Sequence, residues 1–162
     1  MLPEEVTADS TVTPSSEFDE FVGLSESRLH DAMAALFGPQ SGRDATAEAL
    51  AYAWEHWGRV GQMDNPLGYV YVVARDLGRK ARTGRRVVLM PLDPARIPWV
   101  EPNLPIALSS LSDKQRVVVM LLHCHDWTMT EVADLLGVSK STIQSYDTRG
   151  MRKLRRRLGV EQ

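Results

Sequence analysis

Residues 128–158 read TMTEVADLLGVSKSTIQSYDTRGMRKLRRRL, which predicts a short helix, a turn and a long helix. Gly137 stands where the turn needs a left-handed residue, four positions after the small residue Ala133. Ser139 follows as a helix cap, and Ile143 is placed to pack the second helix against the first. Together these positions predict a helix-turn-helix.

The second helix of this motif carries short polar and basic side chains on the side expected to face solvent. Hydroxyl and amide groups can bond to base edges in the major groove, and basic groups near the helix end suit phosphates. A capped amphipathic helix with a solvated basic end is the alternative, but the glycine and alanine spacing is independent of the charge pattern. The candidate residues are Ser139, Lys140, Ser141, Thr142, Gln144, Ser145, Thr148, Arg149 and Arg152.

A second basic pattern lies earlier in the chain, on the helix expected to start at Asn65-Pro66. One side of this helix is apolar, and the opposite side is basic with an aromatic residue at its head. Such a stripe can follow a phosphate backbone while the ring stacks on an unpaired base, although an ordinary solvated face is the alternative. The stripe consists of Tyr71, Arg75, Arg79, Arg82 and Arg86.

The remaining sequence is also predicted to be helical outside one proline-rich segment. Helices are expected from a capping box at Ser16, from near Asp44, and from a capping box at Ser112. Five prolines between residues 87 and 105 exclude a helix there. The fold class is therefore all-α, with two small helical modules joined by a proline-rich linker. We assign a flexible tail to 1–15, the first module to 16–86, the linker to 87–105 and the second module to 106–160.

Composition narrows the function classes further. Of the 162 residues, 43% are hydrophobic and 25% charged, which is typical of a folded domain without a membrane span. The single cysteine, Cys124, allows no internal disulfide, and its neighbours His123 and His125 cannot converge with it on one metal from a helix. No phosphate loop or nucleophile motif is present, so we expect no enzyme, no cofactor and no metal.

Charge is distributed unevenly along the chain. The net formal charge of −2 hides an acidic segment over residues 1–40 and two basic segments over 41–86 and 107–162. Two basic segments in an acidic chain predict two surfaces that face polyanions, with the acidic remainder available to a protein partner.

Taken together, the two halves resemble the extracytoplasmic-function (ECF) sigma factors, the smallest specificity subunits of bacterial RNA polymerase. The resemblance covers about residues 17–158. In region 2 it rests on DATAEALAYAW at 44–54 and NPLGYVYVVARDL at 65–77, and in region 4 on LSDKQR at 111–116 and EVADLLGVS at 131–139. Asp76 stands where family members commonly have asparagine, and Gln144 replaces a more usual basic residue.

The resemblance implies a division of labour between the modules. The helix that includes Asp44, Glu48 and Glu55 would bind the core polymerase, through its beta and beta-prime subunits. Asp64 and Asn65, with Tyr71, Arg75, Arg79 and Arg82, would recognise and melt the minus-ten promoter element. The second module would bind the minus-thirty-five element through the residues given above for its helix-turn-helix.

The resemblance also implies partners and location. The expected partners are core polymerase, promoter DNA and an anti-sigma factor, with no membrane, and the free protein is expected to be a monomer in the bacterial cytoplasm. Two other hypotheses remain open from the residues alone. One is a stand-alone helix-turn-helix transcriptional regulator, and the other is a degenerate sigma-like interaction protein.

Overall fold

The structure is a computed structural model that describes residues 13–82 and 101–160. Within these residues the regular structure is entirely helical, which confirms the all-α prediction. Arg86 and most of the predicted linker lie outside the described residues. The helices are α1 (Pro14–Phe37), α2 (Pro39–Glu55), α3 (Trp57–Val60), α4 (Pro66–Ala81), α5 (Leu104–Ser109), α6 (Asp113–Cys124), α7 (Met129–Leu136) and α8 (Lys140–Leu158).

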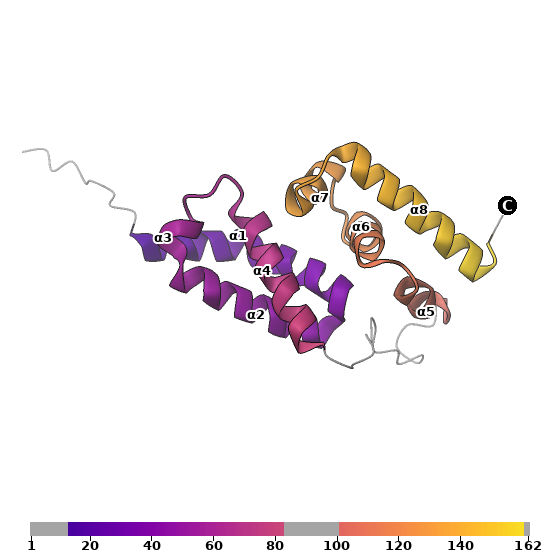
Figure 1. The fold of residues 1–162 in the computed structure, drawn as a ribbon, viewed down its shortest axis with the longest axis horizontal. Helices are drawn as coiled ribbons and strands as arrows, with labels where there is room; N and C mark the ends of the chain where they lie inside the picture. Colours follow the sequence, from indigo (N-terminus) through magenta and orange to yellow (C-terminus); the bar gives the residue numbers. More distant parts are fainter. Residues whose placement is uncertain (1–12, 83–100, 161–162) are drawn as a thin grey trace, which may run out of the picture.

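Helices α1, α2 and α4 pack together as the first module (Figure 1). A Cβ atom at Gly42 would lie 2.6 Å from the backbone nitrogen of Ala34, so the missing side chain lets α2 approach α1 closely. Asn65 caps α4 as predicted, because its side chain accepts a hydrogen bond from the backbone nitrogen of Gly68 at 2.9 Å. Among the helices described, none is long and apolar enough to cross a membrane.

Two predicted helix starts in this module are wrong. Helix α1 begins at Pro14 with Thr13 as its N-cap, so Ser16 is not the cap and helix extends into the tail predicted for 1–15. Helix α2 begins at Pro39 instead of near Asp44. Gly38, with φ at 86°, turns the chain within a single residue, and proline is well suited to the first position of the next helix.

Helices α5 to α8 form the second module. The capping boxes at Ser112 and Thr128 are both present, and Gly137 adopts the predicted left-handed conformation with φ at 66°. Ile143 is completely buried, as the motif requires. Helix α5 was not predicted, because Pro105 lies inside it. Proline is tolerated there because the first turn of a helix needs no amide donor.

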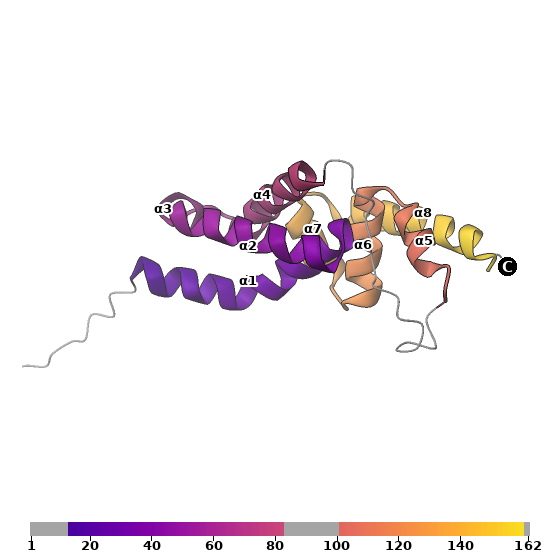
Figure 2. The same cartoon turned by 90° about the horizontal axis from the view of Figure 1, so that it is seen from below.

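The two modules are in contact and share one hydrophobic core. Helix α6 packs on α1, and α7 packs on α4, as Figures 1 and 2 show from two directions. Leu29 and Met33 of the first module and Val117 and Leu121 of the second belong to one buried cluster. The sequence patterns predicted two modules but gave no indication of this contact.

Arg116 of α6 links the modules through a buried guanidinium group, with the residue only 3% exposed. Its Nε donates to the backbone oxygen of Ala35 at 2.8 Å, and Nη2 donates to that of Leu36 at 3.1 Å. Nη2 also pairs with Asp113 at 2.9 Å, and Nη1 donates to the Leu111 carbonyl at 3.1 Å. The last carbonyls of a helix have no partner within it, so Arg116 satisfies acceptors at the end of α1.

Replacing Arg116 with methionine should destabilise the whole chain. Arg116→Met keeps much of the apolar stem but leaves buried carbonyl groups without a donor, which we expect to cost about 3 kcal/mol. Chemical denaturation followed by circular dichroism measures the loss. Arg156→Met, on the exposed side of α8, is the control, and equal stability of the two variants would contradict the role assigned to Arg116.

Candidate nucleic-acid interface

Helix α8 presents a polar face at the outer edge of the molecule (Figure 1). Its inner side is held by buried Ile143, Gly150 and Leu154. At Gly150 a Cβ atom would lie 2.7 Å from Val119, so α8 runs close against α6. This packing fixes which side of α8 faces outward.

The N-terminus of α8 is organised by three hydroxyl groups. Ser139 Oγ accepts a hydrogen bond from the backbone nitrogen of Thr142 at 3.2 Å, and it lies 2.9 Å from both Ser141 Oγ and Thr142 Oγ1. Ser139, Lys140 and Ser141 are exposed. The capping group and its neighbours are therefore accessible from the outer face.

A shallow hollow runs along the same face of α8. Hydroxyl, amide and guanidinium groups supply both hydrogen-bond donors and acceptors to it, which is the combination that reads base edges and binds phosphates. The structure thus brings together on one accessible side the residues predicted from the helix-turn-helix. The hollow is lined by Ser141, Gln144, Ser145, Thr148, Arg149 and Arg152.

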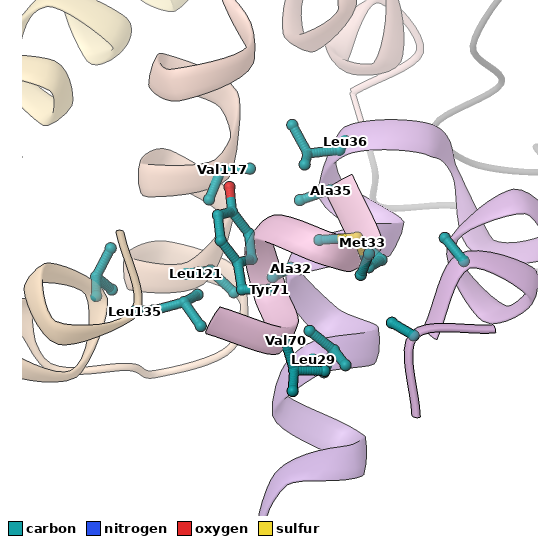
Figure 3. Close-up of a cluster of buried hydrophobic side chains, with 14 of the residues drawn as sticks. Leu29, Ala32, Met33, Ala35, Leu36, Val70, Tyr71, Val117, Leu121 and Leu135 are labelled. Carbon is teal, nitrogen blue, oxygen red and sulfur yellow. The ribbon is translucent and has the colours of Figure 1, made fainter. Parts of the chain in front are cut away.

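Helix α4 is different, because the predicted stacking ring is not accessible. Tyr71 is only 3% exposed, and Figure 3 shows its ring directed toward Val117 and Leu121 of α6. The expectation of an exposed aromatic head is wrong for this conformation. The reason is that α4 has two covered sides, one facing its own module and one facing α6 and α7.

The basic residues of the α4 stripe are paired with carboxylates. Arg75 contacts the neighbouring Asp76 at 3.2 Å. Arg79 and Arg82 both reach Asp113 at the start of α6, at 3.6 Å and 4.0 Å. All three guanidinium groups keep part of their surface in solvent, so they remain able to exchange partners.

The acidic residues of α2 lie on one open side of that helix. Asp44, Glu48 and Glu55 are all exposed, while Ala45 and Ala49 face the core. The spacing of the three acids repeats at helical periodicity, so their carboxylates form a single stripe. This stripe is the acidic surface that the sequence predicted for a protein partner.

A polar aromatic cluster near α3 was missed by the sequence analysis. Arg59 Nη2 donates to the hydroxyl of Tyr52 at 3.2 Å and to that of Tyr69 at 3.1 Å. Hydrogen bonds from Tyr52 and Arg59 lower the pKa of Tyr69. His56 stacks on Tyr52 with ring centroids 4.1 Å apart. Positions 52, 56 and 59 repeat at helical spacing, which is the signal that could have revealed it.

The two histidines beside Cys124 pair with different helices. His123 Nε2 lies 2.8 Å from Asp147 of α8, and His125 Nδ1 lies 3.5 Å from Asp31 of α1. Burial raises the pKa of the Cys124 thiol. These side chains thus join helices and do not converge on one point.

Comparison with known proteins identifies the second module. Residues 107–156 match the sequence pattern of sigma-70 region 4. RNA polymerase sigma factor SigO of Bacillus subtilis (strain 168) is 34% identical over 55 residues, which are 34% of this chain and 31% of that protein. The chain belongs to the ECF-type sigma-70 family. The matched segment spans about a third of SigO.

The whole fold is also that of a known sigma factor. The structure of sigma factor RpoE from Bartonella quintana, solved in complex with the anti-sigma factor NepR, aligns with a TM-score of 0.63 and 20% identity. The alignment covers 90% of this chain and 99% of RpoE, so the arrangement of helices is shared from α1 to α8. The region 4 match lies within the predicted 106–160 module, while the limits of region 2 at 16–86 stay a prediction.

The buried Tyr71 phenol should ionise late in this sigma factor. Burial raises its pKa to about 12, despite nearby Arg75 and Arg79. An unfolded chain ionises tyrosine near pH 10, about its ordinary pKa. The folded state therefore holds the proton longer, and the resulting stability, fully present below about pH 10, is lost as pH rises through about 12.

Ultraviolet absorbance titration of the phenols, with thermal melts at each pH, measures both effects. Tyr71→Phe should remove the last ionisation step and make the alkaline loss of stability shallower. Tyr146→Phe is the control for loss of one phenol and should keep the late step. A wild-type titration with no late step would show that Tyr71 is not enclosed.

Proposed function

We propose that this protein is a sigma factor that binds RNA polymerase core and directs it to specific promoters. The observation that carries the proposal is the exposed, polar and basic face of α8 within the region 4 match. Its groups suit the base edges and phosphates of a major groove. Sigma factors are non-enzymatic initiation factors, so nucleotide addition would belong to the core.

Each module supplies a different contact in this proposal. The α8 face reads the minus-thirty-five element through the nine residues from Ser139 to Arg152 named in the sequence analysis. The acidic stripe of α2, consisting of Asp44, Glu48 and Glu55, binds the beta-prime or beta subunit of the core. The α4 side recognises and melts the minus-ten element through Asp64, Asn65, Tyr71, Arg75, Arg79 and Arg82.

An anti-sigma factor is a further proposed partner. The support for it is the fold shared with RpoE, which was solved bound to the anti-sigma factor NepR. We propose that the free protein is a monomer in the cytoplasm of a bacterium, where the polymerase is found.

Run-off transcription with purified core polymerase tests the proposal directly. The protein should form a holoenzyme with core and support initiation from a subset of promoters in a genomic template pool. A self-dimer that binds duplex DNA and ignores core would favour the stand-alone regulator. Binding to core or to an anti-sigma factor without any initiation would favour a degenerate sigma-like protein.

Charge reversal on the α2 stripe should weaken core binding. Asp44→Lys with Glu48→Lys places like charges opposite a basic partner surface, and we expect a loss of several kcal/mol, on the order of a hundredfold or more in affinity. Affinity for core is measured by fluorescence anisotropy, and folding by circular dichroism. Glu20→Lys with Glu26→Lys on α1 reverses the same charge elsewhere, and equal loss in both would refute the stripe.

Two residues of the α8 face should have separable roles on duplex DNA. Gln144→Ala should relax preference at one base pair of the minus-thirty-five element by about 1–3 kcal/mol, because an amide can bond to an adenine edge. Arg149→Ala should weaken all sequences alike and reduce the salt dependence. Selection from randomised upstream elements measures this, and an unchanged sequence preference for Gln144→Ala would rule out base reading.

A further inference from the structure

The face of α4 that is proposed to hold single-stranded DNA is covered by region 4. Tyr71 lies against α6, where Val117 and Leu121 are completely buried. Helix α7 packs on α4 beside it, and Leu135 of α7 belongs to the same cluster. A base cannot stack on the Tyr71 ring until these two helices move away.

Polar contacts cross the same boundary at both ends. Asn65 Nδ2 donates to the backbone oxygen of Asp134 in α7 at 2.7 Å. Arg28 of α1 pairs with Glu131 of α7, and its guanidinium carbon lies 5.0 Å from the centre of the Trp127 ring. His125 and Asp31 make a third contact between the modules. These groups surround the buried Tyr71 contact on several sides.

The third polar contact involves the strand-binding arginines themselves. Asp113 accepts contacts from both Arg79 and Arg82 and is held in place by buried Arg116. A carboxylate between two guanidinium groups makes the interactions that a backbone phosphate would make there. Asp113 and a single strand therefore compete for the same cations.

We propose that region 4 masks the strand-binding face of region 2 in the free protein, with Asp113 standing in for a DNA phosphate. This inference rests on the proposed function, because it assumes that α4 binds single strands. The outer face of α8 stays open in the masked state. The closed protein thus binds duplex DNA through α8 but binds single strands weakly, and promoter melting requires the modules to separate.

The contacts of the mask are suited to reversible opening. The side chains of Arg79 and Asp113 are 49% and 32% exposed, so salt and competing phosphates can reach them. The apolar part is confined to one aromatic ring and its neighbours. Binding of core polymerase to both regions at once can separate them if the bound arrangement holds them apart.

The first test removes the charge of Asp113 in the full chain. Asp113→Asn keeps an oxygen that can accept from Arg116 but no longer neutralises Arg79 and Arg82. Small-angle X-ray scattering should show a larger radius of gyration. Affinity for a fluorescein-labelled single-stranded oligo(dT) should rise about three- to tenfold, as expected for the loss of two partly exposed ion pairs. Affinity for a duplex that α8 binds should change much less.

A matched control separates opening from simple charge change. Asp76→Asn removes the same charge from a residue that pairs with Arg75 on the same helix and does not reach region 4. It should leave the radius of gyration unchanged and raise single-strand affinity less than Asp113→Asn does. Equal gains in affinity with equal compactness would overturn the proposal.

A second variant tests the mask from the opposite charge. Arg28→Gln removes a positive charge, which by itself would weaken DNA binding, but it also breaks the contact with Glu131. If region 4 is a mask, Arg28→Gln should expand the protein and strengthen oligo(dT) binding. Circular dichroism confirms that each variant is folded.

Two outcomes would overturn the inference in distinguishable ways. Variants that stay as compact as the wild type would show that these ion pairs do not hold the modules together. Variants that expand without a gain in single-strand binding would show that the covered face is not a strand site. Run-off transcription with core polymerase, measured on the wild type, tests the proposed function separately.

Discussion

The buried guanidinium of Arg116 is the interaction on which the arrangement of the two regions depends. It satisfies carbonyl groups at the end of α1 and holds Asp113 in the position where that carboxylate meets Arg79 and Arg82. Burial lowers the pKa of this guanidinium, and Asp113 opposes that effect. Because a buried cation needs its partners, sliding α6 along α1 would leave both charge and carbonyls unsatisfied. The contact between the regions therefore has one favoured register.

This constraint places the two nucleic-acid surfaces in different situations. The α8 face depends only on packing within region 4, through Ile143, Gly150 and Leu154, and it is accessible. The α4 face depends on where region 4 lies, because Tyr71 belongs to the shared core. One surface is always presented and the other is conditional, although both lie in a chain of 162 residues.

Local signals in the sequence predicted much of this structure, because caps and turns are determined by neighbouring residues. The capping boxes at Ser112 and Thr128, the left-handed Gly137 and the cap at Asn65 are all present. The burial of Tyr71 could not be predicted in the same way, since its partners in α6 lie more than forty residues along the chain. Helical periodicity distinguishes an apolar side from a polar one, but it does not show that a second module covers part of the polar side.

Gly150 has a consequence for how DNA specificity could change. Helix α8 touches α6 at this position without any side chain between them, and a Cβ atom would meet Val119 at 2.7 Å. A larger residue here would act as a wedge under a lever, tilting the N-terminal turns of α8 that enter the groove. Promoter preference could then shift through a residue that never meets a base, so the recognition code of this helix includes the thickness of the contact behind it.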